Sequence, residues 1–293
     1  MTDPRLSGLG GSTKGSAMQR PSLGLLNRHL PWLVIATLYA VAYAKLVTMH
    51  GVVWSGWADQ GRYLVSATAF AHLRLDPAEH WYPLLYPLLG APFVWLWPTV
   101  PFLLVDCACF IGAYLGFAAV ARRFGVGPWL ATLLFAASTI LYPEIGRRWL
   151  EPWTTTPSAA LIWLVIAGTL AIFDGPVRRR TAVGTALCMA AIPLVRPGDL
   201  LMVAVLGAMA GWRLLARREL GRIALIATIV LACWTAYLAL HLAIYGPHLS
   251  DYDRLSAAYG ENFAWLGWKA YVLMPIPERG FPTGRGCFTP ARG

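Results

Sequence analysis

Residues 223–245 read IALIATIVLACWTAYLALHLAIY, a run without a single Asp, Glu, Lys or Arg. Its length matches the ~20 apolar residues that a helix needs to cross a bilayer. The rest of the 293-residue chain follows the same trend, since 57% of it is hydrophobic and only 13% is charged. Soluble domains usually carry about 25% charged residues. The sequence therefore predicts an all-α integral membrane protein.

The basic residues fall between the apolar segments. In a soluble protein the formal net charge of +10 would suggest a nucleic-acid partner. Here its distribution favours a role in topology and contact with anionic membrane lipids, and we expect no nucleic-acid binding. Four of the five cysteines lie in apolar runs, and Cys107 and Cys109 lack the C-x-x-C spacing of redox or zinc sites, so we expect no disulfide framework.

The apolar segments predict crossings at about 31–49, 99–120, 128–143, 155–173, 181–195, 198–215 and 223–245. Residues 83–98 are ambiguous, because prolines and aromatic residues interrupt a short apolar run. If 83–98 stays at the interface, the arginines within 122–123, 178–180 and 213–222 share the cytoplasmic side, whereas a crossing would place them all outside. We therefore predict about seven transmembrane helices, with interfacial helices in the first outer loop.

This topology divides the chain into three parts. Residues 1–30 are expected to form a disordered basic cytoplasmic tail, residues 31–245 a multi-spanning domain whose first outer loop is 50–98, and residues 246–293 an outer-face tail that is incomplete. The first apolar segment could also be a cleaved signal peptide, since Ala42-Tyr43-Ala44 resembles a cleavage site. The long polar segment before it favours an uncleaved anchor.

Residues 54–63 read WSGWADQGRY and hold Asp59, the first carboxylate after the first crossing. Beside tryptophans and an apolar surface, such a carboxylate can act as a general base or as a metal ligand next to a donor phosphate. The competing interpretation is helix capping, because Asp is favoured where a helix begins. The apolar spacing from Asp59 to Leu75 indeed predicts a helix, which its charges should keep on the membrane surface.

Four arginines on the predicted outer side are candidates for binding a substrate phosphate: Arg62, Arg147, Arg148 and Arg196. Guanidinium binds phosphate oxygens bidentately and stays charged near lipid. The competing interpretations are contact with lipid headgroups for Arg147 and Arg148, and an ion pair with Asp199 for Arg196.

Glu151 is a candidate second carboxylate, for a metal or an acceptor. We interpret Glu144 instead as the ion-pair partner of the neighbouring arginines. Pro157 is expected in the first turn of the next helix. Lys45 and Asp106, both inside predicted crossings, are expected to form a structural ion pair, because buried charges in lipid tend to pair.

One further cluster carries metal-ligand residue types: His72, Asp76, Glu79 and His80. Pro77 interrupts any common helical face, and the spacing matches no recognised ligand pattern. We interpret this cluster as a hydrated loop and assign no metal site.

One helix, then the outer-loop sequence WADQGRY at 57–63, then WYPLLYPLL at 81–89, resembles the beginning of GT-C-type membrane glycosyltransferases. These polyprenyl-phosphate-sugar-dependent enzymes include protein O-mannosyltransferases and the aminoarabinose or mannose transferases of bacterial envelopes. In that family an acidic residue of the first outer loop is the catalytic acid/base, which Asp59 matches. Arg196-Pro197 resembles the Arg-Pro at a helix end in many members, and Glu151 falls where some members place another acidic residue.

The resemblance implies an inverting hexosyl- or pentosyltransferase at the outer face of the bacterial inner membrane. It would move a sugar from a polyprenyl-phosphate donor to a hydroxyl of an envelope glycan, lipid or protein. Asp59 is followed by Gln rather than by the second acid seen in some members, so the need for a divalent cation stays open. A transporter or flippase of a lipid-linked glycan, or an inactive truncated relative, is the alternative. No repeated halves, which many transporters have, are visible in the sequence.

Overall fold

The computed structural model describes residues 22–50 and 58–254. Within these ranges every regular element is a helix, and no strand occurs. The α-helices are α1 (Ser22–His50), α2 (Ala58–Ala71), α3 (Leu85–Gly90), α4 (Leu103–Arg123), α5 (Pro128–Ser138), α6 (Pro143–Leu150), α7 (Thr155–Asp174), α8 (Arg179–Val195), α9 (Leu200–Ala216) and α10 (Leu220–Tyr245). Three short 3-10 helices are η2 (Pro77–Glu79), η3 (Ala91–Phe93) and η4 (Pro197–Asp199).

In the described part of the chain, five segments are long and apolar enough to cross a membrane: His29–Met49, Leu103–Arg123, Thr155–Asp174, Pro197–Ala216 and Leu220–Tyr245. This agrees with a multi-pass membrane protein. The two other predicted crossings correspond to α8, with 17 residues, and α5, with 11. At ~1.5 Å per residue, both are shorter than the ~30 Å hydrocarbon core of a typical bilayer.

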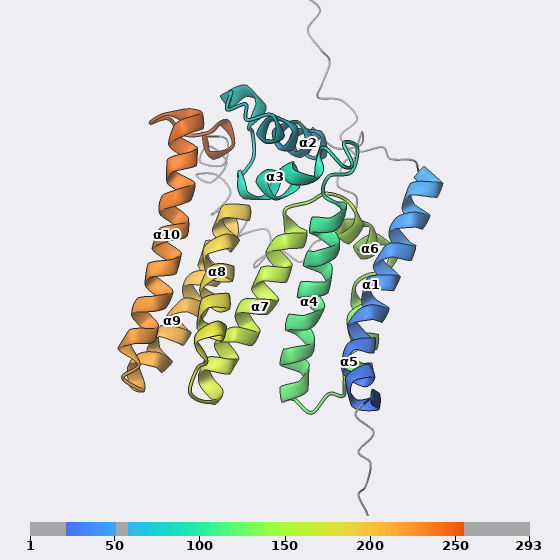
Figure 1. Cartoon of the computed structure of the whole chain (residues 1–293), viewed down its shortest axis with the longest axis vertical. Coiled ribbons are helices and arrows are strands. Elements are labelled where there is room, and N and C mark those ends of the chain that lie inside the picture. Colours follow the sequence, from blue (N-terminus) through green and yellow to red (C-terminus); the bar gives the residue numbers. More distant parts are fainter. Residues whose placement is uncertain (1–21, 51–57, 255–293) are drawn as a thin grey trace, which may run out of the picture.

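The elements of the first predicted outer loop lie across one end of the long helices, as Figure 1 shows for α2 and α3. Residues 83–98 form only α3 and η3, of 6 and 3 residues, which are too short to cross a membrane. α2 follows the predicted apolar spacing: Tyr63, Ala67 and Phe70 are buried against the elements beneath. It ends at Ala71. Two residues later Leu73 adopts a left-handed φ of 55°, and the chain turns there.

The basic segments gather at one end, the end at which α7 finishes. Arg123 pairs with Asp174 at 2.6 Å, so the end of α4 meets the end of α7. Arg217, just after α9, donates to the carbonyls of Ile172 and Phe173 at 2.8 and 2.9 Å. Cations at these positions satisfy carbonyls that the last turn of a helix leaves unpaired. The basic segments thus share one end, as the charge pattern predicts.

α4 and α7 pack closely at the centre of the helices. Gly116 of α4 permits this approach, because a Cβ built there would lie 2.6 Å from the carbonyl carbon of Trp163 on α7. Gly168 of α7 does the same toward α8, where a Cβ would meet the Thr185 hydroxyl at 2.1 Å. Small residues at such contacts let helix backbones approach each other, as is common in membrane bundles.

The predicted Lys45–Asp106 pair is wrong. Asp106 is 2% exposed and accepts hydrogen bonds from the Tyr86 hydroxyl at 2.9 and 3.0 Å. Lys45 lies on the exposed side of α1, and no ion pair joins it to any acid of the described ranges. Burying both charges would cost desolvation of two ions, whereas a tyrosine hydroxyl satisfies Asp106 and ties α3 to α4.

The first helix starts earlier than expected. α1 begins at Ser22 and contains Pro31, so residues 22–30, which we assigned to a disordered tail, are helical. Leucines favour helix formation in this stretch. Residues 1–21 lie outside the described residues.

Gly116→Ala is expected to lower stability by about 1–3 kcal/mol, because the added methyl overlaps the Trp163 backbone. Gly112→Ala, one turn earlier on the same helix, is the matched control: its Cβ would meet its nearest neighbour at 3.7 Å, an ordinary contact. Thermal unfolding of the purified proteins in detergent measures both. A Gly116→Ala protein as stable as the Gly112→Ala protein would contradict the close α4–α7 contact.

Candidate functional site

Asp59 lies in the first turn of α2. The helix dipole favours a carboxylate there, but Asp59 is the second residue of the helix and not the capping residue that precedes it. The side chain has a second partner as well, because its Oδ1 accepts a hydrogen bond from the Tyr82 hydroxyl. Asp59 is half-buried. Residues 54–57, which precede it in the sequence motif, lie outside the described residues.

Tyrosines surround this carboxylate. The Tyr82 ring lies 4.8 Å from that of Tyr63 and 5.4 Å from that of Tyr252, centroid to centroid. Burial, followed by the hydrogen bond to Asp59 and its negative charge, raises the pKa of the Tyr82 hydroxyl. Burial likewise raises the pKa of Tyr63. Both hydroxyls therefore stay protonated at neutral pH and can donate hydrogen bonds.

Gln60 connects α2 to the segment between α6 and α7. Its Nε2 donates to Glu151 Oε2 at 3.3 Å, and Glu151 Oε1 accepts from Arg147 Nε at 2.5 Å. Glu151 is only 8% exposed, so the arginine compensates a nearly buried charge. The same hydrogen bond raises the pKa of the Arg147 guanidinium.

The ion pair that we predicted for Glu144 is formed by Glu151 instead. Glu144 is exposed and takes part in no ion pair with the described residues. Arg147 and Glu151 are four residues apart, the spacing that brings side chains together on one face of a helix. Glu151 therefore contacts both Arg147 and Gln60.

Arg196 follows the last residue of α8. Its Nε lies 3.9 Å from Asp199 Oδ2, a loose ion pair, and the same Asp199 oxygen accepts a hydrogen bond from the Ser158 hydroxyl at 2.5 Å. The predicted alternative, a pair with Asp199, is thus formed. The Arg196 side chain is nevertheless 47% exposed, and the residue directly before it, Val195, packs in one buried cluster with Tyr63 of α2.

The other two predicted arginines contact tryptophans. The Arg62 guanidinium carbon lies 4.0 Å from the centre of the Trp81 ring, and that of Arg148 lies 5.6 Å from the centre of the Trp153 ring. The positive charge of a guanidinium is attracted to the face of an aromatic ring, so these contacts need no acidic partner. Arg62, exposed and one turn from Asp59, is the better placed of the two for a ligand at the start of α2.

A cavity of about 480 Å³ lies among α3, α4, α7, α8 and α10. Apolar side chains dominate its wall, among them Leu85 of α3, Pro157 of α7 and Leu240 of α10. The wall includes Val195, the residue directly before Arg196. No charged side chain lines it. The cavity therefore offers an apolar space that reaches the base of Arg196.

The cluster around His80 is structural. Its Nε2 contacts the Arg74 carbonyl at 3.0 Å and its Nδ1 contacts the Ser66 hydroxyl at 2.7 Å, so a neutral ring protonated on Nε2 satisfies both partners. Burial lowers the pKa of His80, and the residue is 1% exposed rather than in a hydrated loop. The Tyr245 hydroxyl donates to its carbonyl and so ties α10 to this loop. No group of three potential metal ligands occurs among the described residues.

The structure thus brings together residues that are far apart in the sequence. Asp59 is linked to Glu151 through the neighbouring Gln60, and to the neighbourhood of Arg196 through Tyr63. Tyr63 also reaches the Thr154 hydroxyl at 3.5 Å. Sequence reasoning missed Gln60, and it used Tyr82 only as part of a motif. Both residues lie in short stretches that the sequence had already marked as a candidate site, and this was the signal that could have identified them.

No protein-family model matches the chain, and neither a curated protein nor a solved structure shows significant similarity to it. The resemblance to GT-C-type transferases therefore rests on the sequence motifs within residues 50–245.

The lowered pKa of His80 predicts a stability that depends on pH. The folded protein favours the neutral ring, so this stabilisation is present above the ordinary histidine pKa of about 6.5 and is lost as the pH falls below it. His80→Phe should remove this pH dependence and, by leaving the Ser66 hydroxyl and the Arg74 carbonyl without the His80 ring, cost about 1–3 kcal/mol at pH 7.5. The melting temperatures of the wild type and of His80→Phe, compared between pH 7.5 and 5.5, measure this pH dependence.

His72→Gln is the control, since His72 is exposed and directly follows α2, whereas His80 is buried after η2. It should keep the pH dependence of the wild type. If His80→Phe kept it too, another group would be responsible.

Proposed function

We propose that the protein is an inverting glycosyltransferase of GT-C type. It transfers a hexosyl or pentosyl unit from a polyprenyl phosphate to a hydroxyl of an envelope glycan, lipid or protein. The observation that carries the proposal is the position of Asp59, a carboxylate held by Tyr82 at the same end of the helices as Arg196 and the apolar cavity beside it. These three features match the needs of the reaction: a base, a phosphate ligand and a place for a lipid chain.

In this mechanism Asp59 takes the proton of the acceptor hydroxyl as the hydroxyl oxygen attacks the anomeric carbon. A new C–O bond forms on one face of the sugar, and the bond to the phosphate oxygen breaks on the other. Polyprenyl phosphate leaves with the bonding electrons. A phosphate is already a good leaving group, so the reaction needs no second carboxylate as acid, unlike the paired acids of glycosidases.

Each neighbour of Asp59 has a role in this scheme. The Tyr82 hydroxyl fixes Oδ1, which leaves Oδ2 to approach the acceptor. Arg196 binds the donor phosphate by exchanging its loose contact with Asp199, at 3.9 Å, for bidentate hydrogen bonds. Arg62 supplies a second positive charge at the start of α2. A divalent cation, if one takes part, would be held by Asp59 and the donor phosphate together, since the described residues contain no cluster of three potential ligands.

The proposed topology has seven crossings in the bacterial inner membrane, with the N-terminus in the cytoplasm and Asp59 on the outer face. The gathering of the basic segments at the end opposite α2 supports it. α8 begins with Arg179 and Arg180 and is followed by Arg196. Arginines at both ends of a short helix can reach the two interfaces by extending along its axis, and the bilayer can thin locally. α5 would cross together with α6, which continues toward the same end as α2 (Figure 1).

Asp59→Asn is expected to lower sugar transfer by at least about 100-fold, because loss of a general base typically costs 10²–10⁴. The fold should be kept, since the amide oxygen still accepts the Tyr82 hydrogen bond. The assay uses the full chain in nanodiscs with a radiolabelled sugar on polyprenyl phosphate and envelope extracts as acceptors.

A matched pair tests the phosphate ligand. Arg196→Lys should raise the KM for the donor, since lysine binds phosphate as a point charge and not bidentately. Arg179→Lys, at the opposite end of the same helix, should behave as wild type.

Wild-type turnover in Asp59→Asn would reject Asp59 as the base. Absence of transfer together with movement of the donor between the leaflets of vesicles would replace the transferase by a transporter.

A further inference from the structure

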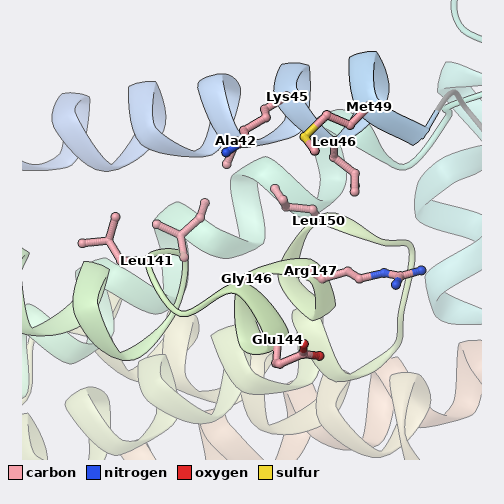
Figure 2. Close-up of a pocket in the computed structure, with 10 residues that line it drawn as sticks. Ala42, Lys45, Leu46, Met49, Leu141, Glu144, Gly146, Arg147 and Leu150 are labelled. Carbon is pink, nitrogen blue, oxygen red and sulfur yellow. The ribbon is translucent and has the colours of Figure 1, made fainter.

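A second cavity, of about 450 Å³, lies between α1 and the α5–α6 segment. Figure 2 shows Leu46 and Met49 of α1 on one side of this space and Leu141 and Leu150 on the other. Its walls are mainly apolar, and Met49 and Leu141 are more than half exposed. The cavity is therefore an open apolar pocket at the side of the protein and not part of a closed core.

Charged side chains stand at the edge of this pocket. Lys45 and Arg147 contribute two positive charges and Glu144 one negative charge. Lys45 takes part in no ion pair with the described residues. Arg147 gives Glu151 only its Nε, and its side chain is 64% exposed. A net positive edge around an apolar pocket complements an amphiphile whose headgroup is anionic.

The pocket is separate from the cavity beside Arg196. That cavity is lined by residues of α3, α4, α7, α8 and α10, whereas this one is lined by residues of α1, of α6 and of the segment between α5 and α6. In Figure 1 the packed α4–α7 pair stands between α1 and α6 on one side and α8 and α10 on the other. The two cavities thus flank the central helix pair.

We propose that the pocket between α1 and α6 binds an anionic membrane lipid. Its phosphate binds at the positive edge, where Lys45 and Arg147, which extend in opposite directions in Figure 2, turn toward the headgroup, and one acyl chain runs between Leu46 and Leu150. The headgroup of a zwitterionic lipid would bring its own positive charge toward Lys45 and Arg147, so the charge of the pocket favours an acidic headgroup. In the proposed transferase this is where a lipid-anchored acceptor enters; that role rests on the proposed function, whereas the binding does not.

A short chain of contacts connects the pocket to Asp59. Arg147 holds Glu151, Glu151 holds Gln60, and Gln60 is the neighbour of Asp59 on α2. A guanidinium carries five N–H donors, so Arg147 can bind a phosphate while it keeps Glu151. Arg147 would therefore position a lipid in the pocket and, through Glu151 and Gln60, also help to place α2.

The test is photolabelling of the full chain in phosphatidylcholine nanodiscs that contain a trace of phosphatidylglycerol with a diazirine in its acyl chain. Labelled peptides are mapped by mass spectrometry. We expect labels within 42–49 and 140–150, and at least about tenfold less labelling there in Lys45→Gln/Arg147→Gln, since each basic group contributes roughly a fivefold preference for an acidic lipid. Ala42→Phe, which fills the pocket without changing its charge, should reduce labelling as well.

Ala236→Phe is the matched control, because it fills the cavity beside Arg196 instead and should leave this labelling unchanged. Lys45→Gln alone changes only an exposed side chain and secures the result if the double variant unfolds. Equal labelling by a phosphatidylcholine probe, or labelling that Ala42→Phe and Lys45→Gln both leave intact, would overturn the site. The readout does not depend on sugar transfer. Labelling of a protein that transfers no sugar would support the lipid site and reject only the proposed function. An active protein that is not labelled would reject the lipid site alone.

Discussion

The close approach of α4 and α7 is the constraint on which the other features depend. A side chain at Gly116 would overlap the backbone of Trp163, so this position keeps the two helices at their short distance. Asp106, near the start of α4, accepts from Tyr86 and anchors α3 above the pair. The two apolar cavities described above lie on either side of this helix pair.

The ends of the helices differ in how they use charge. At the end where α7 finishes, arginines pair with Asp174 and with helix carbonyls, so their role there is structural. At the other end the ion pairs Arg147–Glu151 and Arg196–Asp199 also occur, but Asp59 meets the neutral Tyr82 hydroxyl and Arg62 meets the Trp81 ring. These neutral partners leave the charges of Asp59 and Arg62 uncompensated, so both can still attract a substrate. This difference, rather than the number of charges, makes the α2 end the candidate site.

Local patterns in the sequence predicted much of this arrangement. The helix that begins near Asp59 follows from apolar spacing, and Pro157 in the first turn of α7 follows from proline chemistry. The expectation that 83–98 does not cross came from the distribution of the arginines, and the elements there are too short to span a membrane. The contact of Gln60 with Glu151 spans 91 residues and depends on where α2 comes to lie, which no local pattern records. The expected partner of Asp106 was wrong because charge alone suggested lysine, while burial favours a neutral hydroxyl.

We propose that the α2 end faces outward and the basic end faces the cytoplasm. Single cysteines introduced at Ala78 and at Arg179, both exposed and at opposite ends, test it in an otherwise cysteine-free protein. Intact cells are treated with a membrane-impermeant maleimide, and permeabilised cells show that both positions can react. The account predicts that position 78 is labelled in intact cells and position 179 only after permeabilisation. Labelling of position 179 from outside, with position 78 protected, would contradict it.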